Sequence, residues 1–193
     1  MSRWGPAICF LLLATPAAAE WQIKPFAGIA FGGSTSFVDP EVAAGQAHRL
    51  LGVNAALLGE VLGLEGDVAR VPGFFQSGDG QFVLSSSVVT LTGNLVVAMP
   101  KRVFQYTLRP YFVAGAGILR VHTEPNLGTL PLASTRPAVD IGGGATGFLS
   151  DRFGISWELR YFRSIGRGGT SGASFTPEQL AFWRATMAMA IRY

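Results

Sequence analysis

Two stretches near the end of the chain decide its fold: residues 155–162 read ISWELRYF, and residues 183–193 read WRATMAMAIRY. In both, apolar or aromatic side chains alternate with polar, charged or small ones, and Phe162 is the main exception. Successive side chains of a β-strand point to opposite faces, so a period of two indicates a strand with one apolar face. We therefore expect both stretches to be strands.

The same alternation recurs upstream, with weaker contrast in places. The further candidate strands are residues 21–31, 49–58, 62–71, 83–99, 108–121 and 139–149. Residues 108–121 are apolar on both faces, so the orientation of this strand stays open. Most of these lengths are close to, or exceed, the roughly 9–11 residues that a tilted strand needs to cross a bilayer.

The connections between these strands alternate in length. Short ones are expected at residues 59–61, 100–105 and 150–153. Longer ones, rich in Gly, Ser and Pro, are expected at residues 32–48, 72–82, 122–137 and 163–178. Transmembrane barrels have short turns on one side of the membrane and long loops on the other. The pattern predicts an all-β, eight-stranded antiparallel up-and-down transmembrane β-barrel rather than a soluble β-sandwich, whose connections need not alternate.

The N-terminus has the order of a secretory signal peptide. Arg3 gives it a positive start, an apolar core follows, and residues 17–19 are three alanines that fit a cleavage site. We expect residues 1–19 to be a signal peptide, cleaved near Ala19, and residues 20–193 to form one β-barrel domain.

Composition excludes several classes of protein. Hydrophobic residues make up 49% of the chain. After the signal peptide no stretch has the ~18 consecutive apolar residues that a membrane-spanning helix needs. The formal net charge is only +3, and no Lys/Arg cluster resembles a nucleic-acid site, so we expect no nucleic-acid partner. The single cysteine, Cys9, lies in the expected signal peptide, which excludes a disulfide framework.

Five segments, taken in order, match a known pattern. They are WQIKPFAGIAFG (21–32), LGLEGDVARV (62–71), RPYFVAGAGILRV (109–121), VDIGGGATGFLSDRFGISWELRYFR (139–163) and FWRATMAMAIRY (182–193). With the signal peptide and the final aromatic residue, they resemble the bacterial outer-membrane β-barrel domain family, the porin-like small barrels related to the membrane domain of OmpA. The resemblance implies a location in the bacterial outer membrane, in contact with its lipid and lipopolysaccharide. Unlike OmpA, the chain ends at the last strand, so we expect no periplasmic peptidoglycan-binding domain.

The last strand carries a further implication of the resemblance. In such barrels a C-terminal strand with a terminal aromatic residue is the signal that the barrel-insertion machinery reads. The matching residues are Tyr193, Ile191, Met189 and Met187.

Aromatic residues gather at both membrane interfaces of such barrels. We expect Trp21 and Phe153 to lie at the periplasmic interface, near the C-terminus. Phe31, Tyr161 and Trp183 are expected to form the opposing belt.

The inward positions carry a balanced set of charges. The expected interior network consists of Lys24, Glu65, Asp67, Asp140, Glu158, Arg160, Arg184 and Arg192. Unpaired charges are costly away from bulk water, so four acids and four bases predict mutual pairing, for example of Glu158 with Arg184. Closure of the barrel is expected to bring Lys24 towards the last strand. Eight strands enclose only enough room for side chains, which favours a packed interior over an ion or proton pathway.

No residue pattern points to catalysis, to a metal or to a cofactor. Without a nearby His or Cys, Glu65 and Asp67 fit the charge network better than a metal site. No Lys-Ser/Thr follows residues 142–144, three glycines, so they indicate curvature or close packing rather than a phosphate loop. We therefore expect a non-enzymatic barrel with a structural or surface-interaction role, whose long loops could meet an extracellular ligand.

Two other functions stay open. A lipid-modifying barrel enzyme would use His48 or His122, both near strand ends on the loop side, although no local motif joins either histidine to a serine. A secreted lipocalin-like carrier would need apolar residues that point inward. The charged inner face is evidence against the carrier.

Overall fold

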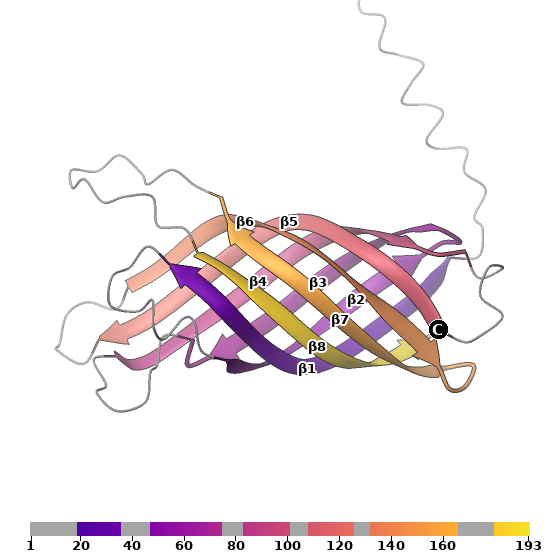
Figure 1. Cartoon of the computed structure of the whole chain (residues 1–193), viewed down its shortest axis with the longest axis horizontal. Coiled ribbons are helices and arrows are strands. Elements are labelled where there is room, and N and C mark those ends of the chain that lie inside the picture. Colours follow the sequence, from indigo (N-terminus) through magenta and orange to yellow (C-terminus); the bar gives the residue numbers. More distant parts are fainter. Residues whose placement is uncertain (1–18, 36–46, 75–82, 101–107, 126–131, 166–179) are drawn as a thin grey trace, which may run out of the picture.

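The computed structural model describes residues 19–35, 47–74, 83–100, 108–125, 132–165 and 180–193. Eight strands in these ranges form one closed barrel (Figure 1). They are β1 (Glu20–Thr35), β2 (His48–Leu58), β3 (Leu62–Pro72), β4 (Val83–Ala98), β5 (Leu108–Pro125), β6 (Leu132–Phe148), β7 (Phe153–Ser164) and β8 (Leu180–Arg192). The described residues hold no helix that is long and apolar enough to span a membrane.

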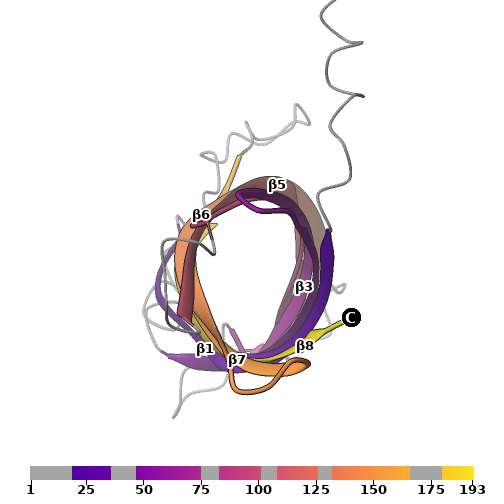
Figure 2. The same ribbon diagram turned by 90° about the vertical axis from the view of Figure 1, so that its right-hand side faces the viewer.

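Every strand pairs antiparallel with its neighbours in sequence, and β1 pairs with β8 to close the ring. Figure 2, a view along the barrel, shows this closure. Because the number of strands is even, the start of β1 and the end of β8 lie at the same end, where Gln22 is opposite Arg192. The predicted eight-stranded antiparallel barrel is confirmed.

The connection expected at residues 122–137 is the largest difference from the sequence prediction. β5 continues to Pro125, β6 begins at Leu132, and the two strands pair as far as Thr123 opposite Leu132. The prediction of a long loop here is therefore wrong, because residues 122–125 and 132–137 are paired strands that continue the wall. Its Gly/Pro/Ser content resembles that of a loop, but pairing with the neighbouring strand decides its conformation.

Among the described strands, the first residues of β6 pair with β5 alone. Residues 132–137 pair with β5, whereas pairing with β7 starts at Ala138, opposite Ser164. The carbonyl of Pro137 accepts a hydrogen bond from Ile165 N on the β7 side, so the N–H that proline lacks would also face that side. Proline is tolerated here because the ladder with β5 needs no donor from it.

Alternation of burial along the strands is as the sequence predicts. β3 alternates between exposed and buried residues from end to end, and β7 nearly so. Outward residues are apolar and exposed, as Leu64 and Trp157 illustrate. The structure also settles the orientation of β5: Arg109 and Tyr111 point inward, and Phe112 points outward.

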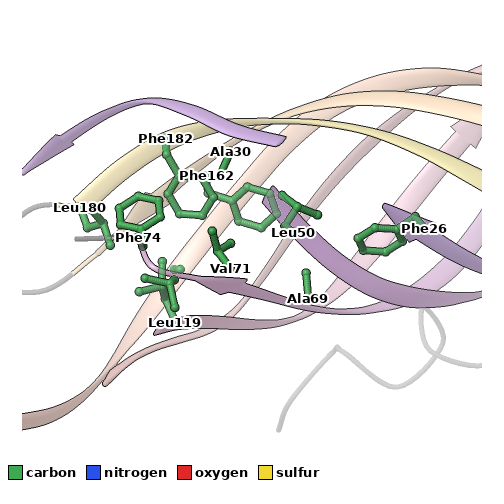
Figure 3. Packing of buried hydrophobic residues seen from close by; sticks show 12 residues of the cluster. Phe26, Ala30, Leu50, Ala69, Val71, Phe74, Leu119, Phe162, Leu180 and Phe182 are labelled. Carbon is green, nitrogen blue, oxygen red and sulfur yellow. The ribbon is translucent and has the colours of Figure 1, made fainter. Parts of the chain in front are cut away.

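Two apolar clusters occupy the interior, one towards each end. The cluster at the loop end contains Phe74, Phe162 and Phe182, all fully buried (Figure 3). The rings of Phe162 and Phe182 are stacked 5.2 Å apart, and Phe74 meets Phe182 edge-on at 5.4 Å. The cluster at the turn end consists of Ala56, Leu58, Val96, Ala98, Tyr111 and Val113. Charged side chains fill the space between the two clusters.

Candidate functional site

Seven of the eight charged residues expected inside the barrel are buried there, each at most 6% exposed. They are Lys24 on β1, Glu65 and Asp67 on β3, Asp140 on β6, Glu158 and Arg160 on β7, and Arg184 on β8. We call these seven residues the charged layer. Their side chains reach the interior because each lies on the inward row of its strand, and pairing across the lumen then joins strands that are not neighbours in the sheet.

Arg160 is the centre of the charged layer. Its guanidinium donates to Glu158 through Nε and, at 2.7 Å, through Nη2. It also donates to Glu65 across the lumen and, at 3.2 Å, to Asp140. One fully buried side chain therefore pairs with carboxylates from three strands.

Arg184 forms the second ion-pair centre. It makes a bidentate pair with Asp67, with Nη1–Oδ1 and Nη2–Oδ2 distances of 2.8 and 2.9 Å. It lies 3.6 Å from Glu158, the partner expected from the sequence. Its guanidinium carbon is 4.9 Å from the ring centre of Phe26 and 4.7 Å from that of Phe162. These cation–π contacts join the charged layer to the apolar cluster at the loop end.

Lys24 pairs with β3 rather than with the last strand. Its Nζ lies 3.7 Å from Glu65 and 4.9 Å from the ring centre of Tyr111. Register explains the difference. Across the β1–β8 seam, Phe26 is opposite Ala188 and no acid of β8 lies within reach, because β8 contains none.

Arg192 does not join the charged layer. It lies at the turn end, where it pairs with Glu20 at 3.6 Å, donates to the carbonyl of Asp151 and packs over the ring of Phe148. Its side chain is 27% exposed. Without it the charged layer holds four acids and three bases, and a fourth buried base, Arg109, lies nearer the turn end.

Polar residues that the sequence interpretation missed complete the layer. Tyr111 donates to Glu158 at 2.9 Å and lies 3.2 Å from the hydroxyl of Ser156. Asn94 donates to Glu65 at 3.3 Å. At the turn end, Arg109 donates to the carbonyls of Gly59, Glu60 and Met99, and so ties two connections together. Tyr111 and Arg109 were missed because the apolar faces of their strand left its orientation open.

Glycines bring β6 and β7 close together beside the charged layer. A Cβ on Gly142 would lie 2.3 Å from the carbonyl oxygen of Leu159 and 2.7 Å from Cγ of Arg160. A Cβ on Gly144 would lie 2.3 Å from the carbonyl oxygen of Trp157 and 2.9 Å from the Tyr111 hydroxyl. Small size at these positions lets two large polar side chains approach the wall.

The solved structure of neisserial surface protein A matches this barrel with a TM-score of 0.62 over 90% of this chain and 97% of that chain, at 12% identity. The chain has the fold of the small outer-membrane β-barrels. The Pseudomonas aeruginosa outer-membrane protein OprG matches with a TM-score of 0.61 over 92% of this chain and 97% of that one, at 14% identity. Yersinia pestis Ail, solved in complex with the heparin analogue sucrose octasulfate, matches with a TM-score of 0.52 over 89% and 98%, at 13% identity. No protein-family model matches the sequence, and no curated protein does.

The aromatic residues expected at the two interfaces of this outer-membrane-type barrel lie in two groups. At the loop end, Tyr161 is opposite Trp183, which is also opposite Phe31 across the β1–β8 seam, and the rings of Tyr161 and Trp183 are 5.1 Å apart. At the turn end, Trp21 and Phe153 are exposed, and the carbonyl of Trp21 accepts a hydrogen bond from the amide of the C-terminal residue.

The proposed insertion-signal residues lie on the outward row of β8. Met187 and Met189 are 64% and 50% exposed, Ile191 is partly exposed, and Tyr193 follows the strand with 80% exposure. Recognition of this row by the insertion machinery stays a prediction.

The two histidines lie on opposite faces of the wall. His48 is on the inward row of β2, with its ring 5.4 Å from that of Phe74. His122 is on the outward row of β5, directly opposite Ser87 of β4. The sequence could not show this His–Ser pair, because the two residues meet only through the register of β4 and β5. Among the described residues no group of three or more His, Cys, Asp or Glu side chains could hold a metal ion.

Proposed function

We propose that the protein is an integral protein of the bacterial outer membrane with a packed, non-conducting interior and a non-enzymatic role at the cell surface. One observation carries the proposal: a closed wall with an apolar outer face surrounds a charged layer that is sealed between two apolar clusters. Closure satisfies the backbone hydrogen bonds without water, which is what a strand structure needs in a bilayer.

Packing of the lumen supports a non-conducting barrel. Three fully buried phenylalanines cross the interior at the loop end, and Arg160 and Arg184 occupy the middle, at 0% and 1% exposure. Water-filled pores occur in barrels with many more strands, whereas eight strands leave room only for side chains.

Export and insertion belong to the same proposal. We assign residues 1–19 as a signal peptide that is removed near Ala19, although residues 1–18 lie outside the described part of the chain. The outward row of β8 that ends at Tyr193 is the segment that we expect the insertion machinery to bind. Outer-membrane lipid and lipopolysaccharide then surround the wall.

The loop end is the side that we expect to meet an extracellular partner. The connections at residues 36–46, 75–82, 126–131 and 166–179 leave the strands at this end, and they lie outside the described residues. Ail, which has the same fold, was solved with a heparin analogue. This example supports contact with a surface ligand as the role of a barrel of this kind.

Cell fractionation combined with a conductance measurement tests the proposal. We expect the protein in the outer-membrane fraction, running faster on a gel unless boiled, because a folded barrel resists detergent. The same unboiled material should give no discrete conductance steps in planar bilayers. A soluble periplasmic protein would contradict the location, and reproducible channels would contradict the closed interior.

A lipid-modifying enzyme is the second candidate, and the pairing of Ser87 with His122 favours it. Both residues lie on the outward face towards the loop end, where a lipid could reach them. A serine activated by a neighbouring histidine could attack an ester of a lipid.

This candidate predicts altered lipopolysaccharide in cells that express the protein, seen as a change of acyl-chain mass by mass spectrometry. His122→Ala and Ser87→Ala should each abolish the change, by at least about a hundredfold in rate. His48→Ala is the matched control, because this histidine faces inward. Unchanged lipid with the wild-type protein would contradict the enzyme and support the first proposal.

A further inference from the structure

On the outward rows of three strands, an arginine follows the apolar residues towards the loop end. On β3 the outward residues are apolar or Gly from Leu62 to Val68, and Arg70 follows. On β2, which runs away from the loop end, Arg49 comes two residues before the exposed Leu51, and on β5 Arg120 comes two residues after the exposed Ile118. All three arginines are exposed. The apolar belt is thus bounded by positive charge on this side of the barrel.

Strand register places the three arginines next to one another. Arg70 is opposite Val89, and Val89 is opposite Arg120, so these two arginines are separated by one strand, or about 10 Å at the spacing of neighbouring strands. Arg70 is also opposite Leu51, two residues from Arg49, which makes Arg49 and Arg70 diagonal neighbours at about 7–8 Å. We call Arg49, Arg70 and Arg120 the arginine patch.

The arginine patch has no ion-pair partner among the residues that the structure describes. None of its guanidiniums forms an ion pair or a side-chain hydrogen bond within the described strands and turns. The acids of the charged layer lie on the inner face of the wall. Glu124 follows four residues after Arg120 on β5, opposite Ser85 and nearer the end of the strand. Arg70 lies about 7–10 Å along the wall from each of the other two arginines, and like charges at this spacing repel one another, so the arrangement favours a bound anion.

At the same end, the opposite side of the barrel carries aromatic residues instead of the arginine patch. There Phe31, Tyr161 and Trp183 of β1, β7 and β8 form an aromatic row. Arg163 also lies on this side, two residues beyond Tyr161, but it already has a partner. The arginines without a partner in the described part of the chain are therefore a local patch, not a uniform ring of the kind that would only mark the membrane surface.

We propose that the arginine patch binds the head group of a glycolipid that carries two phosphates, as the lipid part of lipopolysaccharide does. The planar guanidinium binds phosphate through two parallel hydrogen bonds, and Arg70 and Arg120 are far enough apart to hold separate phosphates. The acyl chains lie against the outward rows of β2 to β5, where Leu51, Val68 and Ile118 are exposed. This inference rests on the proposed function, because it needs the barrel in an outer leaflet.

Binding measured in micelles tests the arginine patch without depending on cell location. The purified protein in zwitterionic detergent is titrated with bisphosphorylated lipid A and with dephosphorylated lipid A, and binding is followed by tryptophan fluorescence. The triple variant R49Q/R70Q/R120Q should bind the bisphosphorylated lipid at least about tenfold more weakly, because three charge-assisted contacts are lost. The matched control R136Q/R152Q/R163Q removes the same charge elsewhere and should bind within about twofold of wild type.

Three results would overturn the proposal. Equal weakening in both triple variants would show a general effect of charge, and equal affinity for dephosphorylated lipid would show binding through acyl chains alone. Displacement by inorganic phosphate or sucrose octasulfate at the concentrations where lipid A binds would assign the patch to a soluble anion. Unboiled gel mobility confirms that each variant is folded. A soluble protein in the fractionation test would contradict the proposed function even if lipid binding in micelles held, so the two failures are distinguishable.

Discussion

Arg160→Met should destabilise the folded barrel by about 3–5 kcal/mol, the cost of leaving buried charges without their partner. Glu65, Asp140 and Glu158 all accept hydrogen bonds from this guanidinium, and each is nearly inaccessible to solvent. Methionine has a similar volume, so little of the loss comes from packing. Urea unfolding in phospholipid vesicles, followed by tryptophan fluorescence, measures the change.

Two further variants separate charge from size at Arg160. Arg160→Lys keeps the charge but cannot donate to three carboxylates in the same geometry, so it should recover only part of the stability. Adding Glu158→Gln to Arg160→Met removes one uncompensated carboxylate and should restore part of the loss. Arg152→Met, in an exposed turn, should stay within about 0.5 kcal/mol of wild type. A loss below about 1 kcal/mol for Arg160→Met would mean that the charged layer is hydrated rather than sealed.

Gly142→Ala should cost about 1–3 kcal/mol, whereas Gly66→Ala should be neutral or stabilise by up to about 1 kcal/mol. The added Cβ at Gly142 meets a backbone carbonyl of β7 and the stem of Arg160, and neither can move without opening the β6–β7 ladder. At Gly66, on the outward face, no atom lies within 4 Å of the added Cβ.

Backbone strain does not contribute to the expected difference between Gly142→Ala and Gly66→Ala. Among the described residues, positive φ occurs only at Gly32 and Gly73, so neither Gly66 nor Gly142 needs the freedom of glycine. Alanine also lowers the entropy of the unfolded chain equally at both sites. The same urea titration measures both variants, and equal stabilities would contradict a close approach of β6 and β7 at Gly142.

Sequence alternation predicted whether a charged residue lies on the inner or the outer face of the wall. It did not predict how far along the barrel axis the residue lies. Arg160 and Arg192 both occupy inward rows, yet Arg192 is at the end of β8 and lies at the rim. Height depends on register and strand length, which are set by pairing with distant parts of the chain. The same limit explains Lys24, whose partner is on β3, and the pair of His122 with Ser87.

The sequence pattern predicted the strands well where one face of the strand was apolar and the other was polar or small. It failed at residues 122–137, where prolines resemble a loop but pairing with β5 makes a strand. It also left Tyr111 outside the expected interior set, because alternation carries no information when both faces are apolar. Each of these errors falls where tertiary pairing outweighs local preference.

The pairing of the first residues of β6 with β5 alone also limits how deeply the loop end of the barrel can lie in a bilayer. No strand among the described residues covers the β7 side of residues 132–136, and backbone groups on such an edge need water or another polar partner, since open sheet edges do not occur in the hydrocarbon region. In the proposed membrane location, we therefore expect the surface of the hydrocarbon no higher than Ala138, where β7 begins to cover that edge. Arg120, opposite Thr135, is just above this level, and Val139, opposite Arg163, is just below it. The exposed Arg120 and Arg163 therefore both lie within three residues of the water boundary that we expect from backbone solvation.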